Sequence, residues 1–497
     1  MDGSDLASSF VKPSIAVADP VPLVIDADVA LFPSGLMAEA ALRAVKADML
    51  RVPQIIRCWL RGRGHLEAML AGEIAPDREW ARRAADGDVL QLAEDEAASG
   101  RAVYLITRDT GALLGAAPDA FPFVAGVIGA GDETASDARS RAAVLSRRFP
   151  QGFDYAGARG SDTNVWRHAR TAIPVRPSRV LGRSAAQVAA VGSQVGASTP
   201  RLRALIEELR PHQWAKNLLV LVPILLAGRA GDLGALGNSA LAFLALCAVA
   251  SAGYVVNDLW DLADDRHHWW NRRRPLASGR VPIAHAVAGI PLILLAGGVL
   301  ASMASRDVLL LVALYFVLTL AYSLELKRVA ILDGVVLAGL FTIRIGVGIA
   351  AAEVPPSPWL LVFSMFLFAS LSYAKRLNEI VRLGGSATEP LRGRGYHRED
   401  APLVLAIGTA AGIGAVLILV LYLIHEAFAQ PFYGNPLGLW LLPPLLFLFV
   451  GRVWLVSNRA RMNGDLIAFA FADRSCLALM GLMVAAFSFA WLAPEIF

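Results

Sequence analysis

The 497-residue chain has little cysteine and little charge, and both shortages exclude classes of protein. Its cysteines, Cys58, Cys247 and Cys476, lack the paired spacing of a disulfide framework or a zinc site. Only 18% of the residues are charged, whereas 56% are hydrophobic, a balance that is too apolar for an ordinary soluble protein. The net charge of +4 gives no indication of a nucleic-acid partner.

The chain also lacks the pattern of a secretory signal. Its opening stretch, MDGSDLASSFVKPSIAVADP, carries acids where a signal has basic residues, and it contains no continuous apolar core. We therefore expect the N-terminal part of the chain to lie in the cytoplasm.

Long apolar runs are unevenly distributed along the chain. Before about residue 205 the sequence is mixed and charged, whereas beyond it uncharged runs recur at about the 18 to 20 residues needed to cross a bilayer. The sequence predicts a soluble domain followed by an all-α membrane bundle with the lipid bilayer around it. We expect about nine transmembrane helices, near 215–230, 235–256, 283–303, 307–324, 330–352, 357–374, 402–424, 437–456 and 474–493.

Basic residues are scarce in one set of loops between these spans and frequent in the other. The loops after the second, fourth, sixth and eighth spans are rich in arginine and lysine, while the opposite loops hold only Arg229 and Arg306. Cytoplasmic loops carry an excess of basic residues. We therefore expect an integral protein of the inner (plasma) membrane, with its polar loops and a pocket open to the cytoplasm.

A dense charge cluster follows the second expected span, in the stretch VVNDLWDLADDRHHWWNRRRP (255–275). At about 100° per residue, Asp258, Asp261 and Asp265 fall within about 60° of one another on a helix, and Asn257 lies beside them. Acids at the C-terminal end of a helix oppose its macrodipole. Two interpretations stay open: a solvated helix end with arginine counter-ions, or a divalent cation that bridges the carboxylates to a diphosphate.

These residues resemble the first motif of the UbiA superfamily of intramembrane prenyltransferases, NDxxDxxxD, here NDLWDLADD, followed by RRRPLASGR. The resemblance covers roughly residues 205–497. The stretches LRPHQWAKN and AYSLELKRVAILDGVVLAGLFTIRIGVG look most like the branch that contains decaprenyl-phosphate phosphoribosyltransferase. That resemblance implies a Mg²⁺-dependent transfer of phosphoribose from phosphoribosyl diphosphate to a polyprenyl phosphate, with catalytic and metal-binding roles for Asp258, Asp261 and Asp265.

The region of the family's second motif is short of acids. It holds only Asp333, with Lys327, Arg328 and Arg344 nearby in the sequence. Basic residues bind phosphate directly, so this half fits a lipid monophosphate or a sugar phosphate better than a second metal. Arg344 falls inside a span, where a charge costs at least about 2.5 kcal/mol, so it needs a partner, either a ligand or Asp333. The candidate phosphate-binding residues are Asn257, Arg272, Arg274, Lys327, Asp333, Arg344, Lys375 and Arg376.

Two features of these loops leave alternatives open. Lys375 and Arg376 follow the sixth span, where they can bind phosphate or anchor the span among lipid headgroups. Relatives commonly read DRxHPxKRxRP, whereas this chain has Trp269 for the proline and Asn271 for the lysine. The neighbouring arginines can compensate for that lysine, and reduced activity is the alternative.

The first part of the chain has strands that end in polar residues. VPLVIDADVALF (21–32) ends in two acids, RAVYLIT (101–107) ends in Thr107, and GFDYAG (152–157) is followed by Asp162. Polar residues at the carboxyl ends of strands that alternate with helices predict a doubly wound α/β sheet with its site along that edge. The segment 34–95 is expected to form a helical cap.

This half resembles the haloacid dehalogenase (HAD) phosphatase superfamily, a Rossmann-like fold. The resemblance implies that Asp26 is the phosphate-accepting nucleophile and Asp28 an acid/base, that Thr107 holds the phosphate, and that Asp162 belongs to the fourth motif.

The match to that family is incomplete. Ala30 stands where a threonine is usual, Ala158 where an acid or amide is usual, and no lysine occupies the third motif, where Arg139 and Arg141 are the candidates. Without that lysine, the charge shared by phosphate and nucleophile is poorly neutralised. We expect weak or absent phosphatase activity. The alternative is removal of the 5-phosphate from the lipid-linked product of the membrane half.

The expected organisation is a HAD-like domain at 1–170, a linker with an amphipathic helix at 171–205, and a UbiA-like membrane domain at 206–497. Besides phosphoribosyl transfer, two functions remain possible. One is transfer of a prenyl group from a polyprenyl diphosphate to an aromatic acceptor, against which the missing second aspartate motif counts. The other is a non-catalytic lipid-phosphate-binding or scaffold protein of the cell envelope.

Overall fold

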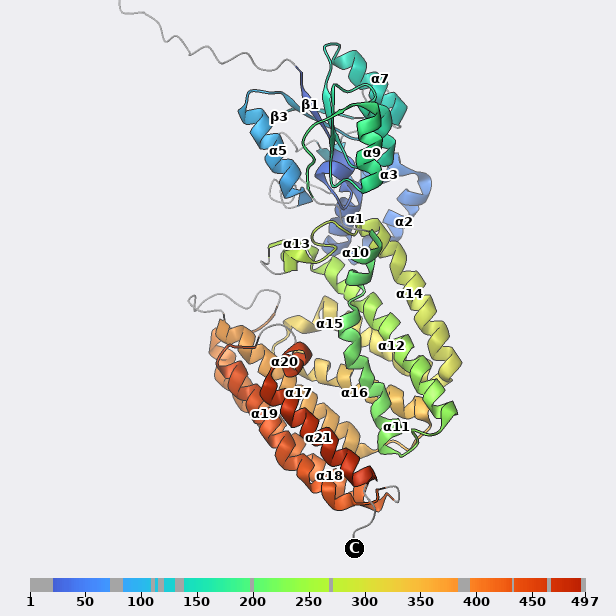
Figure 1. Cartoon of the computed structure of the whole chain (residues 1–497), viewed down its shortest axis with the longest axis vertical. Helices are drawn as coiled ribbons and strands as arrows, with labels where there is room; N and C mark the ends of the chain where they lie inside the picture. The colour runs from blue at the N-terminus through green and yellow to red at the C-terminus, as the bar shows by residue number, and fades with distance from the viewer. Residues whose placement is uncertain are drawn as a thin grey trace, which may run out of the picture. The chain divides into compact units, whose positions relative to one another are not determined.

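The structure is a computed structural model, and it forms two compact units (Figure 1). Unit 1 comprises residues 1–208 together with 261–286, and unit 2 comprises 209–260 together with 287–497. The loop that carries the arginines after the second expected span therefore belongs to the same unit as the N-terminal half. The structure describes residues 21–71, 84–108, 112–114, 120–129, 138–196, 201–267, 271–382, 394–430, 433–462 and 466–492.

Unit 1 is built on a parallel sheet of six strands in the order β3-β2-β1-β4-β5-β6. Its strands are β1 (Leu23–Asp26), β2 (Val103–Ile106), β3 (Val124–Ile128), β4 (Asp154–Gly157), β5 (Thr171–Pro174) and β6 (Ala190–Val191). Every residue of β1 is buried, as expected for a central parallel strand that is covered on both faces. Leu23 pairs with Val103 of β2 on one side and with Asp154 of β4 on the other. The predicted parallel α/β sheet is confirmed.

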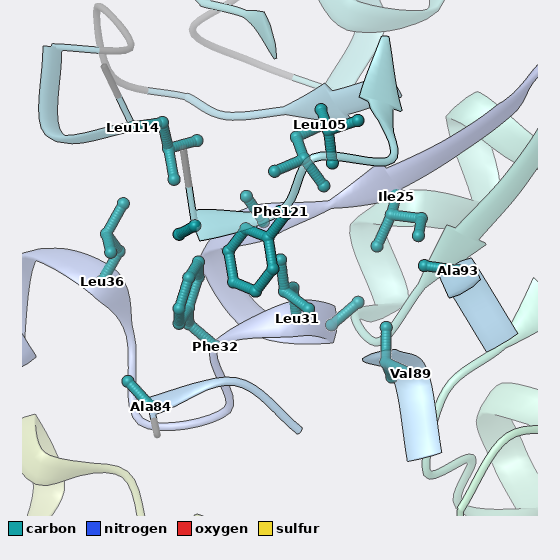
Figure 2. Close-up of a cluster of buried hydrophobic side chains, with 14 of the residues drawn as sticks. Ile25, Leu31, Phe32, Leu36, Ala84, Val89, Ala93, Leu105, Leu114 and Phe121 are labelled. Carbon is teal, nitrogen blue, oxygen red and sulfur yellow. The ribbon is translucent and has the colours of Figure 1, made fainter. Parts of the chain in front are cut away.

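Helices cover both faces of this sheet. One face packs on the apolar cluster of Figure 2, which contains Phe32, Leu36 and Phe121 together with Ile25 of β1 and Leu105 of β2. The other face packs on Trp166 and Leu145. The helices of unit 1 are α1 (Leu36–Ala47), α2 (Val52–Arg61), α3 (Arg63–Ala71), α5 (Gly87–Ala98), α7 (Ala138–Arg148), α8 (Thr163–Trp166), α9 (Arg179–Val188), α10 (Arg201–Glu208) and α13 (Leu262–His267).

The segment that the sequence assigns to a linker adds to the sheet instead. β5, α9 and β6 all lie within 171–191, and β5 pairs along its whole length with β4. Ile173 and Val175 are buried there, so this short apolar run has the pattern of an edge-proximal strand and not of a solvated linker. The amphipathic helix expected at the end of the segment is α10.

Unit 2 is a helical bundle with eight helices long and apolar enough to cross a membrane among the described residues. They are α12 (Leu233–Trp260), α14 (Ile283–Ala304), α15 (Arg306–Leu324), α16 (Leu332–Ala352), α17 (Pro358–Arg382), α18 (Ala401–His425), α19 (Leu442–Asn458) with the 3-10 helix that precedes it (Pro436–Leu441), and α21 (Arg474–Leu492). The short helix α20 (Leu466–Ala472) precedes α21. The chain is an integral membrane protein.

The first of the nine expected spans is not a continuous helix. The segment around 215–230 consists of the 3-10 helix η6 (Pro211–Leu221) and the short helix α11 (Val222–Leu226). Each begins with a proline in its first turn, Pro211 and Pro223, which cannot donate to a preceding carbonyl and so favours a break. η6 packs tightly on α16 at Gly348. The carbonyl oxygen of Val220 lies so close to this glycine that a Cβ there would collide with it.

The order of the crossings places several polar residues at one end of the bundle. Successive spanning helices run in opposite directions, so the C-terminal ends of α12, α15 and α17 and the N-terminal end of α16 share that end. Asn257, Asp258, Lys327, Asp333 and Arg376 lie at these helix ends.

Candidate functional site

Asp258 lies in the last turn of α12 and is almost fully buried. Nη2 of Arg210 donates to both of its carboxylate oxygens, at 2.7 and 2.6 Å. Arg210 precedes η6 and has a left-handed backbone (φ 53°), an uncommon conformation for a residue with a side chain. The ion pair neutralises a carboxylate that would otherwise oppose the helix macrodipole. Arg210 stands in the stretch LRPHQWAKN, but it was not among the residues predicted for the site, and it pairs with Asp258, 48 residues away.

The polar network continues from Asp258 to α15. Nδ2 of Asn257 donates to Asp258 at 3.5 Å, and Nζ of Lys327 donates to Oδ1 of Asn257 at 3.3 Å. Lys327 is buried in the 3-10 helix that follows α15 (Leu326–Arg328). The structure thus brings together two of the expected phosphate-binding residues, Asn257 and Lys327, with the expected metal ligand Asp258.

Asp333 is fully buried in the first turn of α16, where a negative charge is stabilised by the helix macrodipole. Nε of Arg376 donates to its Oδ2 at 2.5 Å, the hydroxyl of Tyr396 donates to its Oδ1, and Arg394 lies 3.9 Å away. Arg376 also donates to Glu379 at 2.5 Å. Lys375, beside Arg376 on α17, is half-buried.

Arg344 does not pair with Asp333, which was one of the two partners expected for it. It lies eleven residues further along α16, or about 16 Å of helix. Its guanidinium donates to Oδ1 of Asn217 (2.9 Å), to the Leu340 carbonyl (2.7 Å) and to the Tyr315 hydroxyl (2.8 Å). These are neutral acceptors, and within the described part of the chain no carboxylate forms an ion pair with Arg344.

The expected continuous carboxylate face is interrupted, because α12 ends at Trp260 and α13 begins at Leu262. In unit 1, Asp265 accepts from Arg274 at 2.5 Å and from Nδ2 of Asn271 at 2.8 Å. Arg272 is exposed. The described residues contain no group of three or more acidic, histidine or cysteine side chains gathered as a metal site. Trp269 lies outside the described residues.

Arg266, the first arginine after the aspartates, is held by Glu39 of α1. Its guanidinium donates to both carboxylate oxygens of Glu39, one of them at 3.1 Å, and to Oγ of Ser34 at 3.4 Å. Arg280 of the same loop donates to Glu207 of α10 at 2.6 Å. The arginine loop is therefore fixed within unit 1 by carboxylates from the N-terminal half.

The strand ends of the sheet gather the second set of predicted residues. The strand order reverses at β1, and the carboxyl edge beside such a reversal is where doubly wound sheets bind ligands. There Oγ1 of Thr107 donates to Asp28 at 2.7 Å, and the amide of Asp28 donates to Asp26 at 2.9 Å. Asp162 accepts from the amides of Ala158 and Arg159 at 3.0 and 2.9 Å.

A buried arginine joins these acids. Arg141 lies 3.5 Å from Asp26 and 3.3 Å from Asp162, whereas Arg139 is exposed. Asp26 and Asp162 are both 0% exposed. Burial, with the nearby charges of Asp162 and Asp28, raises the pKa of Asp26 to about 7 although Arg141 opposes the rise. Burial also raises the pKa of Asp162.

Comparison with known proteins covers the two halves of the chain to different extents. The model of the UbiA prenyltransferase family matches residues 218–477. The uncharacterized protein y4nM of Sinorhizobium fredii is 32% identical over 480 residues, which cover 94% of this chain and 90% of that protein. Decaprenyl-phosphate phosphoribosyltransferase of Mycolicibacterium smegmatis is 37% identical over 183 residues, which cover 34% of this chain and 56% of that enzyme.

Among solved structures, a UbiA homolog from Archaeoglobus fulgidus bound to GPP and Mg²⁺ is 14% identical to this chain. The match covers 57% of this chain and 99% of the homolog's chain, with a TM-score of 0.43.

Proposed function

The chain belongs to the UbiA prenyltransferase family, and on that premise we propose that it transfers phosphoribose from phosphoribosyl diphosphate to a polyprenyl phosphate. The similarity to decaprenyl-phosphate phosphoribosyltransferase supports this choice, although it covers only a third of the chain. We further propose that the protein lies in the inner membrane with its N-terminal half in the cytoplasm, because the basic loops collect on that side.

The observation that carries the choice of donor is the environment of Asp333. Its carboxylate accepts from Arg376 and Tyr396 and has Arg394 nearby, so it is already neutralised by groups of this chain. A prenyl diphosphate held through two aspartate-rich motifs needs a second acidic cluster. A cation-rich environment instead favours a substrate with a phosphate monoester, such as phosphoribosyl diphosphate or a lipid phosphate.

The residues of the first motif fit Mg²⁺ in their chemistry, because Asp258, Asp261 and Asp265 offer the hard oxygen donors that this ion prefers. Their carboxylates are not gathered as one metal site in the described structure, and Asp258 is held by Arg210. We propose that these three residues hold the ion when the diphosphate is present. When bound, Mg²⁺ supplies charge that stabilises the departing diphosphate.

The chain's own side chains would orient the substrates and neutralise the leaving group. An oxygen of the lipid phosphate attacks C1 of the ribose, the bond from C1 to the diphosphate oxygen breaks, and the electron pair leaves with the diphosphate. Arg210 and Lys327 are the cations beside Asp258 and Asn257. They can donate to phosphate oxygens when Asp258 and Asn257 bind the ion or the substrate instead. Arg272 and Arg274 follow in the motif loop.

Two other functions compete with this proposal. Prenyl transfer to an aromatic acceptor uses the same fold and the same first motif, and the neutralised Asp333 counts against it. A non-catalytic lipid-phosphate-binding protein is favoured by Asn271, which replaces the usual lysine and donates to Asp265. Turnover of a labelled substrate separates the second alternative from both enzymes.

We propose weak or absent phosphatase activity for the α/β half, whose assignment as HAD-like rests on the sequence resemblance. Arg141 supplies the cation that the third motif lacked, so poor neutralisation no longer argues against activity. The lack of access to Asp26 now argues against activity, because Asp26 is 0% exposed and its neighbours bond to one another.

Mass spectrometry of the lipid product tests this proposal. If the phosphatase is inactive, Asp26→Asn leaves the number of phosphates on the product unchanged. An additional phosphate on the mutant's product would establish the phosphatase.

The transferase proposal is tested by Asp258→Asn in the full-length protein reconstituted with polyprenyl phosphate, Mg²⁺ and labelled phosphoribosyl diphosphate. Loss of one carboxylate oxygen that serves the ion should lower label transfer by about a hundredfold or more. The matched control is Asp232→Asn, because Asp232 pairs with Arg229 at the opposite end of α12. Undiminished transfer by Asp258→Asn in excess chelator would exclude the metal role.

A further inference from the structure

Helix α2 of unit 1, labelled in Figure 1, carries several large apolar side chains that are exposed. Trp59 is 64% exposed and Leu60 is 73% exposed, and Leu50 in the preceding turn is 86% exposed. Met49 in the same turn and Val52 and Ile56 on α2 are exposed as well. Single exposed apolar residues are ordinary, but a contiguous apolar group of this kind on one short segment marks an interaction surface.

The exposed apolar face is distinct from the face that α2 turns to the core. At about 100° per residue, Ile56, Trp59 and Leu60 lie within about 100° of one another. Ile55 and Cys58 lie on another side, where they pack against the core of unit 1. Ile56, Trp59 and Leu60 are not part of the apolar clusters that the described residues of unit 1 form, so this face is additional to the described core.

The charges beside this face select its partner. The segment 48–63 contains Arg51, Arg57, Arg61 and Arg63 against one acid, Asp48. Arg57 and Arg61 follow each other on the helix side next to the apolar face and are exposed. An apolar stripe with a tryptophan, bordered by arginines, is the composition of a helix that lies in the plane of a membrane interface. The eight candidate spans keep this chain at a bilayer at all times.

We propose that α2, with the preceding turn from Met49 to Arg51, is a membrane-surface helix for bilayers rich in anionic lipid. Trp59, Leu60 and Ile56 enter the boundary between headgroups and acyl chains, and Arg57 and Arg61 remain at the level of the phosphates. The partner is thus a lipid surface. This surface is separate from the residues assigned to phosphoribosyl transfer, so it does not depend on which substrate the bundle uses.

The test uses the full-length protein in nanodiscs that contain an anionic lipid with a photoactivatable carbene precursor in its acyl chain. After illumination and trypsin digestion, we expect lipid adducts on the peptides 52–57 and 58–61. The matched control is the peptide 180–183 of α9, because Val180 is 74% exposed but stands alone. Adducts on α2 that are no more frequent than on this control overturn the proposal.

Variants identify the contribution of each part of the face. Replacing both Arg57 and Arg61 by Gln joins the two peptides into one tryptic peptide, 52–63. The adducts on it should be several-fold fewer than those on the wild-type peptides in phosphatidylglycerol but not in phosphatidylcholine, because each arginine near an anionic surface changes binding by about fivefold. Replacing the exposed Arg147 and Arg148 of α7 by Gln is the control and should change nothing. If α2 is instead protected from hydrogen exchange in detergent in proportion to protein concentration, its partner is a second copy of the chain and the lipid assignment is wrong.

Discussion

The acids of the membrane half are held by arginines from distant parts of the chain. Arg210 binds Asp258, and Arg376 binds Asp333. A phosphate that binds at either place must draw the guanidinium from its carboxylate, and the carboxylate then needs another cation. The transferase proposal therefore predicts that metal and phosphate bind together, since neither ligand alone would leave every buried charge with a partner.

Asp26 supplies a prediction on pH. Its pKa in the folded chain, about 7, exceeds its ordinary value of 3.8, so the folded state holds its proton more tightly than the unfolded state. The stability that this proton gives is complete below about pH 3.8 and is lost as the pH rises through 7. Asp26→Asn cannot lose a proton. In the wild-type protein the free energy of unfolding of unit 1 should fall by roughly 2 to 3 kcal/mol between pH 5 and pH 8 because of this group. In Asp26→Asn this part of the fall should be absent.

Hydrogen exchange of β1 and β4 amides in the full-length protein, corrected for the intrinsic pH dependence, measures this effect. Asp95→Asn on the exposed face of α5 is the control, because its side chain only accepts from Gln91 at the surface. Equal pH dependence in the wild-type protein and in Asp26→Asn would show that Asp26 is ionised in the folded state.

Single residues could be predicted from the sequence where the local pattern of the chain sets their role. They could not be predicted where tertiary packing sets it. Asp26, Asp28 and Thr107 were expected to meet, because parallel strands bring their carboxyl ends to one edge. The acceptors of Arg344, Asn217 and Tyr315, come from η6 and α15. No local pattern specifies those contacts, which arise only from helix packing.

At the scale of elements, the loop 261–286 is fixed to helix α1. Glu39 and Arg266 pair while largely buried, and burial lowers the pKa of Lys46 on α1, although Asp261 and Asp264 of the loop oppose that change. Glu39→Ala would leave the guanidinium of Arg266 without its carboxylate, a change that costs about 3 to 5 kcal/mol for a fully buried pair and less here. We expect faster hydrogen exchange in 271–286, with the exchange of α16 unchanged.

Asp95→Ala is the matched control for that experiment, because it removes a carboxylate from an exposed position of the same unit. Exchange of 271–286 that is as slow in Glu39→Ala as in this control would mean that α1 does not fix the loop.

Long apolar helices were predicted more reliably than short elements whose conformation depends on tertiary packing. Long apolar runs predicted α12 and α14 to α18, because a span needs only length and hydrophobicity. The same criterion predicted one continuous span at 215–230, where the 3-10 helix η6 ends at Leu221 and α11 begins at Val222, beside Pro223. It also gave no warning that 171–191 completes the sheet, since strands as short as β5 and β6 carry little periodic signal.

At the scale of the whole molecule, the two halves are related to known proteins to different extents. The family model covers only 218–477, within the second half. The y4nM protein aligns with 94% of the chain, so the combination of an α/β half with a UbiA half is not peculiar to this sequence. An α/β unit that includes the arginine loop of the transferase motif offers a physical reason for joining them in one chain.

The measurement that tests the central proposal most directly is a competition between donors. The full-length protein is given polyprenyl phosphate, Mg²⁺, phosphoribosyl diphosphate, a prenyl diphosphate and 4-hydroxybenzoate in one mixture, and the lipid products are identified by mass spectrometry. The proposal predicts that polyprenyl phosphate gains the mass of one ribosyl phosphate and that 4-hydroxybenzoate stays unmodified. Prenylated 4-hydroxybenzoate without any phosphoribosylated lipid would contradict it.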